Sequence, residues 1–243
     1  MPCLICGEAN TIDAHIMPRW LVRRVAGKRQ HAAVGYADRL GTQYDGKGAF
    51  DPDLLCAKHE GAFATADDYA ARFLNRHWGR GSAAFERKVW LAPNPKPDLL
   101  VRFAAACLWK RWASPVRVAG VPLDLGPWEH RLRRFLFGGA NDYEPQLVLL
   151  SQRTLLAGEE SGHPLLTEPN ALPSWGRRAY TFQFGDCHFL INLDKRRSYR
   201  DFIPVQANGR NPVPAMIRPD RDWLTEPDML AIVANMRARK PGG

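Results

Sequence analysis

The sequence has no apolar run long enough to cross a bilayer. Its longest run, residues 99–109, is interrupted by Arg102, whereas a transmembrane helix needs about 20 mostly apolar residues. Internal repeats and low-complexity tracts are also missing, which argues against a solenoid or a disordered chain. Cys3 and Cys6 occupy the place of a signal peptide, so we expect none. These absences predict a cytoplasmic protein with no membrane partner.

Cysteine is scarce, with five in 243 residues. An odd number excludes a fully paired disulfide framework, and it fits a reducing compartment. Cys107 and Cys187 lie in apolar segments, where a buried and inert thiol is the ordinary outcome. The three remaining cysteines lie in the first quarter of the chain.

Acidic residues are outnumbered, because 34 Lys and Arg face 25 Asp and Glu for a net charge of +9. This balance favours a polyanionic partner, with nucleic acid ahead of an anionic membrane surface. The apolar content of 45%, with eight Trp and eleven Phe, suffices for a packed core. The length suits one large domain or two small ones.

Two short motifs supply metal ligands. Cys3 and Cys6 form a C-x-x-C motif, and Cys56 and His59 form a C-x-x-H motif. Each two-residue gap allows one tight turn to aim both side chains at the same ion, and thiolate and imidazole are ligands that Zn²⁺ prefers. The sequence therefore predicts a structural zinc site made of these four residues. The alternative is that a residue other than His59 completes the ligand shell.

Between these motifs, His15 stands in the segment A-H-I-M-P-R-W. The arrangement resembles the HNH, or ββα-metal, nucleases, and in particular bacterial HNH-like proteins that share one extended pattern. That pattern runs C-x-x-C, S-H-I-I-P-[KR]-[FW], Q-x-G and L-L-C-x-x-C-E, followed by an acid in a helix. Its counterparts here are Cys3 and Cys6, residues 14–20, residues 43–46, residues 54–60 and Asp67. The resemblance covers about the first third of the chain and continues weakly through residues 103–114 and 128–137.

The resemblance implies that His15 is the general base that takes a proton from the attacking water, a task that suits an imidazole. It also implies a divalent ion, Mg²⁺ or Mn²⁺, at the scissile phosphate. In the wider family the residue before the base is often a metal-binding acid, but here it is Ala14. Asp13 would share one side of a strand with His15. A core histidine bonded to a backbone carbonyl is the structural alternative for His15.

Asp67 matches the acidic position of the resembled family and is our candidate ligand for the catalytic ion, together with Asp13. It lies near the start of a helix expected over residues 61–78, where an acid also stabilises the positive helix end. His77 is an alternative ligand, but about 15 Å of helical rise separates it from Asp67, so the two cannot share one ion. Glu60, Asp45 and Gln43 are weaker candidates for positioning water or substrate.

Basic residues are densest just after the histidine motif, at Arg19, Arg23, Arg24 and Lys28. They are candidate phosphate contacts. A solvated helix face is an equally simple interpretation of the same residues.

Apolar spacing predicts an α+β fold. We expect helices over 20–25, 61–78, 99–113 and 128–137, a strand over 146–150, a hairpin over 180–193 and a helix starting at Thr225. Residues 91–98 contain three prolines and are the candidate linker. It would separate a zinc-stapled ββα-metal (treble-clef) module over 1–90 from an α+β domain over 99–243 for substrate recognition, dimerisation or partner docking.

The function that these features predict is a metal-dependent HNH-like endonuclease that hydrolyses DNA phosphodiester bonds. The resemblance implies a role in bacterial defence, such as defence against phage, or in genome conflict. Two alternatives remain. One is a zinc-containing nucleic-acid-binding module without cleavage, which Ala14 favours. The other is an interaction subunit of a larger complex, whose positive charge meets an acidic protein.

Overall fold

The computed structural model describes residues 1–26, 32–34, 43–45, 48–77, 89–93, 95–115, 123–138, 143–152, 166–172, 178–184, 187–194, 200–218 and 234. Its helices and strands make an α+β protein, as the sequence predicts. Lys28 and the helix expected from Thr225 lie outside the described residues. None of the described helices has the combined length and apolarity of a bilayer-spanning segment.

The N-terminal part is a two-stranded hairpin followed by helices. The elements are β1 (Thr11–His15), α1 (Arg19–Ala26), β2 (Ala32–Val34), β3 (Gln43–Asp45), β4 (Phe50–Cys56), α2 (Ala57–Gly61) and α3 (Ala64–His77). Strands β1 and β4 pair antiparallel, and β2 pairs with β3. Helix α1 and the β2–β3 pair lie between the two strands, and α2 and α3 follow β4, so the ββα-metal fold of residues 1–90 stays a prediction.

Strand β4 contains Pro52, although proline is uncommon inside strands. The register shifts there, from Ile12 opposite Leu55 to Ala14 opposite Asp51. A proline is tolerated in a strand at such an irregularity, where its missing N–H is not needed by the ladder. The shift lies next to Asp13, which is exposed, while Ala14 is completely buried.

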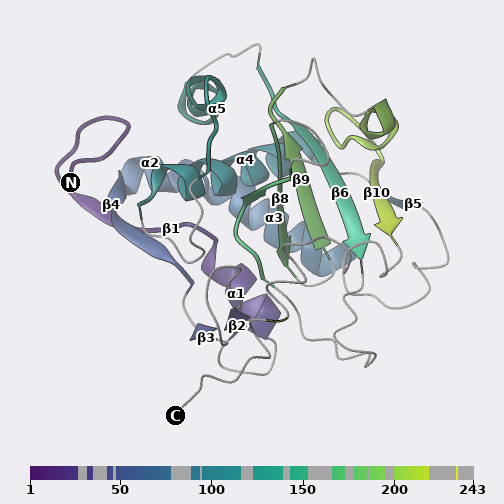
Figure 1. Cartoon of the computed structure of the whole chain (residues 1–243), viewed down its shortest axis with the longest axis horizontal. Helices are drawn as coiled ribbons and strands as arrows, with labels where there is room; N and C mark the ends of the chain where they lie inside the picture. Colours follow the sequence, from purple (N-terminus) through teal and green to yellow (C-terminus); the bar gives the residue numbers. More distant parts are fainter. Residues whose placement is uncertain are drawn as a thin grey trace.

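Two helices follow the N-terminal part, α4 (Pro97–Ala113) and α5 (Trp128–Phe137), in close agreement with the predicted ranges. Helix α4 is buried around most of its circumference, as expected of a helix with neighbours on several sides. It packs against α3, α5, β6 and β9 and lies between the N-terminal part and the large sheet (Figure 1).

A six-stranded sheet forms the other end of the molecule. It consists of β5 (Val89–Ala92), β6 (Gln146–Gln152), β7 (Asn170–Ala171), β8 (Ala179–Phe184), β9 (Cys187–Asn192) and β10 (Val213–Arg218), with the 3₁₀ helix η4 (Arg200–Val205) before the last strand. The order is β5-β10-β6-β9-β8-β7, and only the β10–β6 pairing among the described strands is parallel. The predicted hairpin is the β8–β9 pair.

The hydrophobic core runs through both parts of the molecule. One cluster of buried residues includes Cys3 near the N-terminus, Phe63 before α3, Phe103 in α4 and Ala215 in β10. Within the predicted linker, residues 91–92 belong to β5 and residues 97–98 to the first turn of α4. The linker therefore joins two elements of one core, and the division into two domains stays a prediction.

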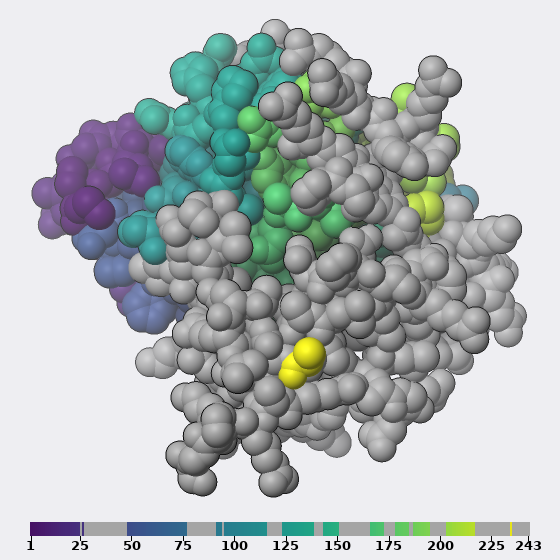
Figure 2. Space-filling model, viewed as in Figure 1, coloured from purple at the N-terminus to yellow at the C-terminus, as the bar shows by residue number. Residues whose placement is uncertain are grey.

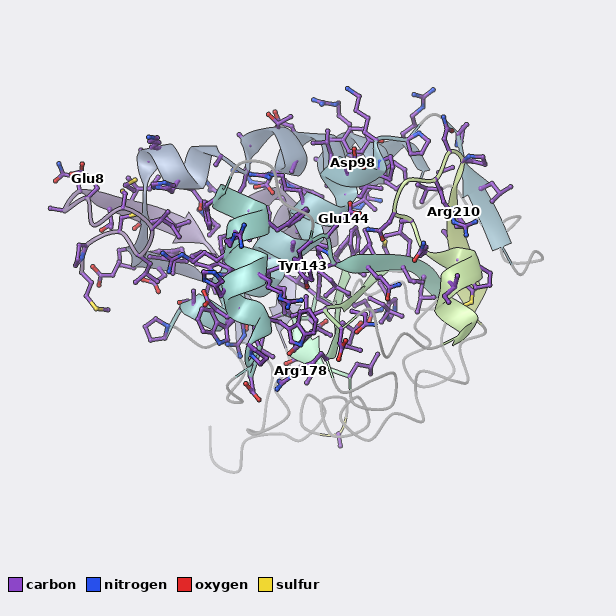
Figure 3. All side chains as sticks on the ribbon, turned by 90° about the horizontal axis from the view of Figure 1, so that it is seen from above. Glu8, Asp98, Tyr143, Glu144, Arg178 and Arg210 are labelled. Atoms are coloured by element: carbon purple, nitrogen blue, oxygen red, sulfur yellow. The ribbon has the colours of Figure 1, made fainter. Side chains whose placement is uncertain are left out.

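The N-terminal segment that contains Cys3 and Cys6, here called the knuckle, projects from one end of the molecule. Figure 2 shows the N-terminal residues in purple at this end. Figure 3 shows the same separation from above, with Glu8 at the knuckle and Arg210 near the far edge of the large sheet. The N-terminal residues therefore lie far from that edge of the large sheet.

Candidate functional site

The predicted zinc ligands come together in space. The ligand atoms of Cys3, Cys6, Cys56 and His59 all lie within 4.8 Å of one another. Cys3 Sγ is 3.6 Å and Cys56 Sγ is 3.2 Å from His59 Nδ1, and the Sγ atoms of Cys6 and Cys56 are 3.8 Å apart. A tetrahedral zinc shell with Zn–S of about 2.3 Å and Zn–N of about 2.0 Å requires S–S separations of about 3.8 Å and S–N separations of about 3.5 Å. The four residues therefore fit a structural zinc ion.

Backbone hydrogen bonds shape the knuckle that carries the first two ligands. The Gly7 N–H donates to Cys3 O at 2.9 Å, and Gly7 adopts a φ of 75°, which glycine accepts without strain. The Leu4 N–H donates to Leu54 O at 3.2 Å, which fastens the knuckle beside the end of β4. Because Cys56 ends β4 and His59 lies in α2, the turn between strand and helix presents the other two ligands.

The Cys3 thiol is prepared for metal binding. Its burial alone would raise the pKa, but backbone hydrogen bonds from Cys56, Cys6 and Ile5 outweigh burial and lower the pKa of Cys3 to about 6. A thiolate is the form that binds metal. By contrast, burial raises the pKa of the Cys107 thiol, which agrees with the inert role predicted for it.

Helix α5 packs an aromatic ring against the ligand imidazole. The Phe137 ring centroid lies 5.7 Å from that of His59, 5.3 Å from that of Phe63 and 5.1 Å from that of Trp109, each in an edge-on arrangement. Residues that surround a metal ligand fix its orientation and so affect metal affinity. The zinc knuckle is thereby joined to α4 and α5 through Phe137.

We expect purified protein to hold about one zinc ion per chain and Cys56→Ser to lose it, because a structural shell needs all four ligands. The same substitution should lower the melting temperature, since metal binding contributes directly to folding free energy. Elemental analysis and thermal unfolding measure both effects. Cys107→Ala is the matched control, a buried thiol outside the shell, and it should retain zinc. Equal zinc content in the two variants would contradict the ligand assignment.

His15, the predicted general base, is the last residue of β1 and lies opposite Phe50 of β4. Its ring is partly buried. Burial lowers the pKa of His15, the charges of Lys110 and Arg19 lower it further, and Glu60 and Asp13 oppose them. The neutral imidazole is therefore favoured at neutral pH, which is the form that accepts a proton.

Asp67 lies in the first turn of α3, within the electrostatic reach of Lys110 and Glu60. Burial raises the pKa of Asp67 to about 6, and Lys110 partly offsets this effect. Its Oδ1 atom and Glu60 Oε2 are buried and have no hydrogen-bond partner among the described residues. Buried carboxylate oxygens without protein partners are commonly satisfied by water or a cation.

Lys110 lies beside Glu60 and acts electrostatically on Asp67, and the sequence analysis did not identify it as a site residue. Its ammonium comes from α4, lies 3.2 Å from Glu60 Oε1 and sits over the Phe63 ring at 5.1 Å from the centroid. The side chain is only 1% exposed. The available signal was a lysine on the apolar face of a helix, since a charge buried there requires a partner.

Asp13, His15 and Asp67 do not form a second metal-ligand group in the described part of the chain, where the Cys and His cluster is the one found. Asp13 is exposed on β1, and Asp67 is partly buried on α3. The charges of Lys110 and Glu60 act on both His15 and Asp67, and Lys110 contacts Glu60 directly.

The predicted phosphate contacts divide into two kinds. Arg19 and Arg23 are exposed one helical turn apart on α1. Arg24 instead points to the end of α3, where its guanidinium donates to Leu74 O at 3.2 Å and to Asn75 Oδ1. This contact satisfies a carbonyl group at a helix terminus, so Arg24 has a structural role.

Comparison with protein-family models, with curated proteins and with solved structures gives no match for this chain.

We expect Lys110→Met to lower the free energy of unfolding by about 3 kcal/mol, because it leaves the Glu60 carboxylate without its buried partner. Adding Glu60→Gln should recover part of the loss, since the uncompensated charge is then removed. Urea unfolding of the two single variants and the double variant measures the coupling. Strictly additive effects would show that the two side chains do not stabilise each other.

Proposed function

We propose that the chain is a metal-dependent HNH-like endonuclease that hydrolyses phosphodiester bonds in DNA. The observation that carries the proposal is the environment of His15, a partly buried imidazole whose pKa is lowered by burial, Lys110 and Arg19 and raised by the nearby acids Glu60 and Asp13. The zinc-ligand cluster and the antiparallel β1–β4 pair, which is followed by α2 and α3, support it. A role in bacterial defence rests on the sequence resemblance alone.

In this mechanism His15 accepts a proton from the water that attacks the phosphorus atom. Arg19 and Arg23 contact neighbouring phosphates and hold the DNA strand against the β1–β4 pair. The carboxylate of Asp67 would be a ligand for a divalent ion, which would neutralise the scissile phosphate and stabilise the leaving oxygen. Cys3, Cys6, Cys56 and His59 would hold a structural zinc ion that joins the knuckle to α2.

The charges around Asp67 support a cation at this place. One ammonium, that of Lys110, faces the two carboxyl groups of Glu60 and Asp67. The Lys110 ammonium contacts Glu60 directly, whereas Asp67 Oδ1 has no partner among the described residues. The Asp67 carboxylate therefore keeps an oxygen that could bind a cation. Lys110 and Glu60, which act on Asp67, also act on His15.

We expect wild-type protein to cleave plasmid DNA with Mg²⁺ or Mn²⁺ and His15→Ala to reduce the rate by about 10²–10⁴-fold, the usual contribution of a general base. His130→Ala is the matched control, because His130 is an exposed histidine on α5. Nicked and linear products are quantified over time. Equal rates for the wild type and His15→Ala would remove His15 from the mechanism.

A nucleic-acid-binding module without cleavage is the second candidate. It is favoured by the buried Ala14 and the exposed Asp13, which leave no acid beside His15 in the geometry of the resembled family. This candidate predicts salt-dependent DNA binding with no product under any divalent ion.

Both candidates require phosphate contacts, and the two kinds of arginine allow a test of them. Arg23→Ala should weaken DNA binding and reduce the slope of log affinity against log salt by about one, as expected for the loss of one phosphate contact. Arg24→Ala should mainly lower the melting temperature, because its guanidinium caps α3. Fluorescence anisotropy across a salt series and thermal unfolding separate the effects. An unchanged salt slope in Arg23→Ala would exclude that contact.

A further inference from the structure

An exposed aromatic ring lies directly across the hairpin from the candidate general base. Phe50 is 39% exposed, although phenylalanine is among the residues most often buried. It pairs with His15 in the β1–β4 register, and the two ring centroids are 6.2 Å apart with a tilt of 47°. Cross-strand neighbours of this kind contact each other, so the phenyl ring extends the surface of the imidazole.

A cation completes this surface. Arg19 is exposed, begins α1 four residues after His15, and lies close enough for its charge to act on the imidazole. A positive group beside an exposed aromatic ring is the combination that single-stranded nucleic acids bind, since the phosphate meets the charge and the base stacks on the ring. The charge is therefore complementary to the backbone of the strand, and the ring to its base.

We propose that Phe50 is a stacking platform for an unpaired nucleobase next to the phosphate that lies at His15 and Arg19. The inference rests on the proposed function for the position of that phosphate. It makes a single-stranded DNA segment the preferred substrate, because bases inside a duplex already have both faces covered by their neighbours.

A second exposed apolar residue on the same hairpin provides a control. Ile12 is 41% exposed, nearly the same as Phe50, but it lies opposite Leu55 and away from His15. It offers similar apolar area without an aromatic face. A difference between substitutions at the two positions therefore reports stacking at Phe50 and not a general loss of surface hydrophobicity.

The test compares two fluorescent probes of equal length and charge, oligodeoxythymidine and an oligomer of abasic sites, in buffer without added divalent metal. Wild-type protein should bind the thymidine probe at least about fivefold more tightly, the smallest effect expected from one stacked base. Phe50→Ala should abolish this preference and Phe50→Trp should retain it. Ile12→Ala should behave as wild type, and circular dichroism confirms that each variant is folded.

Loss of the preference in both Phe50→Ala and Ile12→Ala, retention in Phe50→Ala, or equal wild-type binding of the two probes would each overturn the inference. Since the assay does not require cleavage, the two proposals fail separately. Base-dependent binding through Phe50 without any plasmid cleavage would contradict the nuclease alone. Cleavage with no effect of Phe50→Ala on binding would contradict the stacking role alone.

Discussion

The cluster of three thiols and one imidazole joins segments that are about fifty residues apart in the chain, Cys3 to Cys6 and Cys56 to His59. A segment as short as the knuckle cannot bury enough apolar surface to hold itself, so a metal is the ordinary means of fixing it. Helix α2 begins directly after Cys56 and contains His59. A metal bound by these ligands would therefore fix the knuckle to the end of β4 and to α2, in which Glu60 is the residue after His59.

Helix α4 contacts both parts of the molecule through two neighbouring buried cations. Lys110 pairs with Glu60 on the N-terminal side, and Arg111 Nε lies 2.8 Å from Glu168 Oε2 beside the large sheet. Consecutive helical residues point about 100° apart, so Lys110 and Arg111 can bind partners on two different sides of α4. Buried charges are costly to misplace, because each requires its partner. The two pairs fix how α4 sits between the hairpin module and the sheet.

Local patterns were sufficient for much of this structure. The zinc ligands follow from two-residue gaps, and the range of α5 follows from its apolar spacing. The features that could not be predicted from the sequence depend on contacts between residues far apart in the chain. Burial of Lys110 requires Glu60, fifty residues earlier, and the position of Phe50 beside His15 follows from the pairing of β1 with β4.

The absence of an acid at position 14 has a structural cause in the opposite strand. Ala14 pairs with Asp51, and both are buried. The Asp51 carboxylate accepts hydrogen bonds from Ser114 Oγ at 2.6 Å and from the Asp53 N–H at 2.9 Å, which ties the hairpin to the end of α4. A second carboxylate at position 14 would face Asp51 in a buried setting, where like charges oppose ionisation. Ala14 thus avoids a second carboxylate beside Asp51, at the point where the end of α4 meets the N-terminal strands.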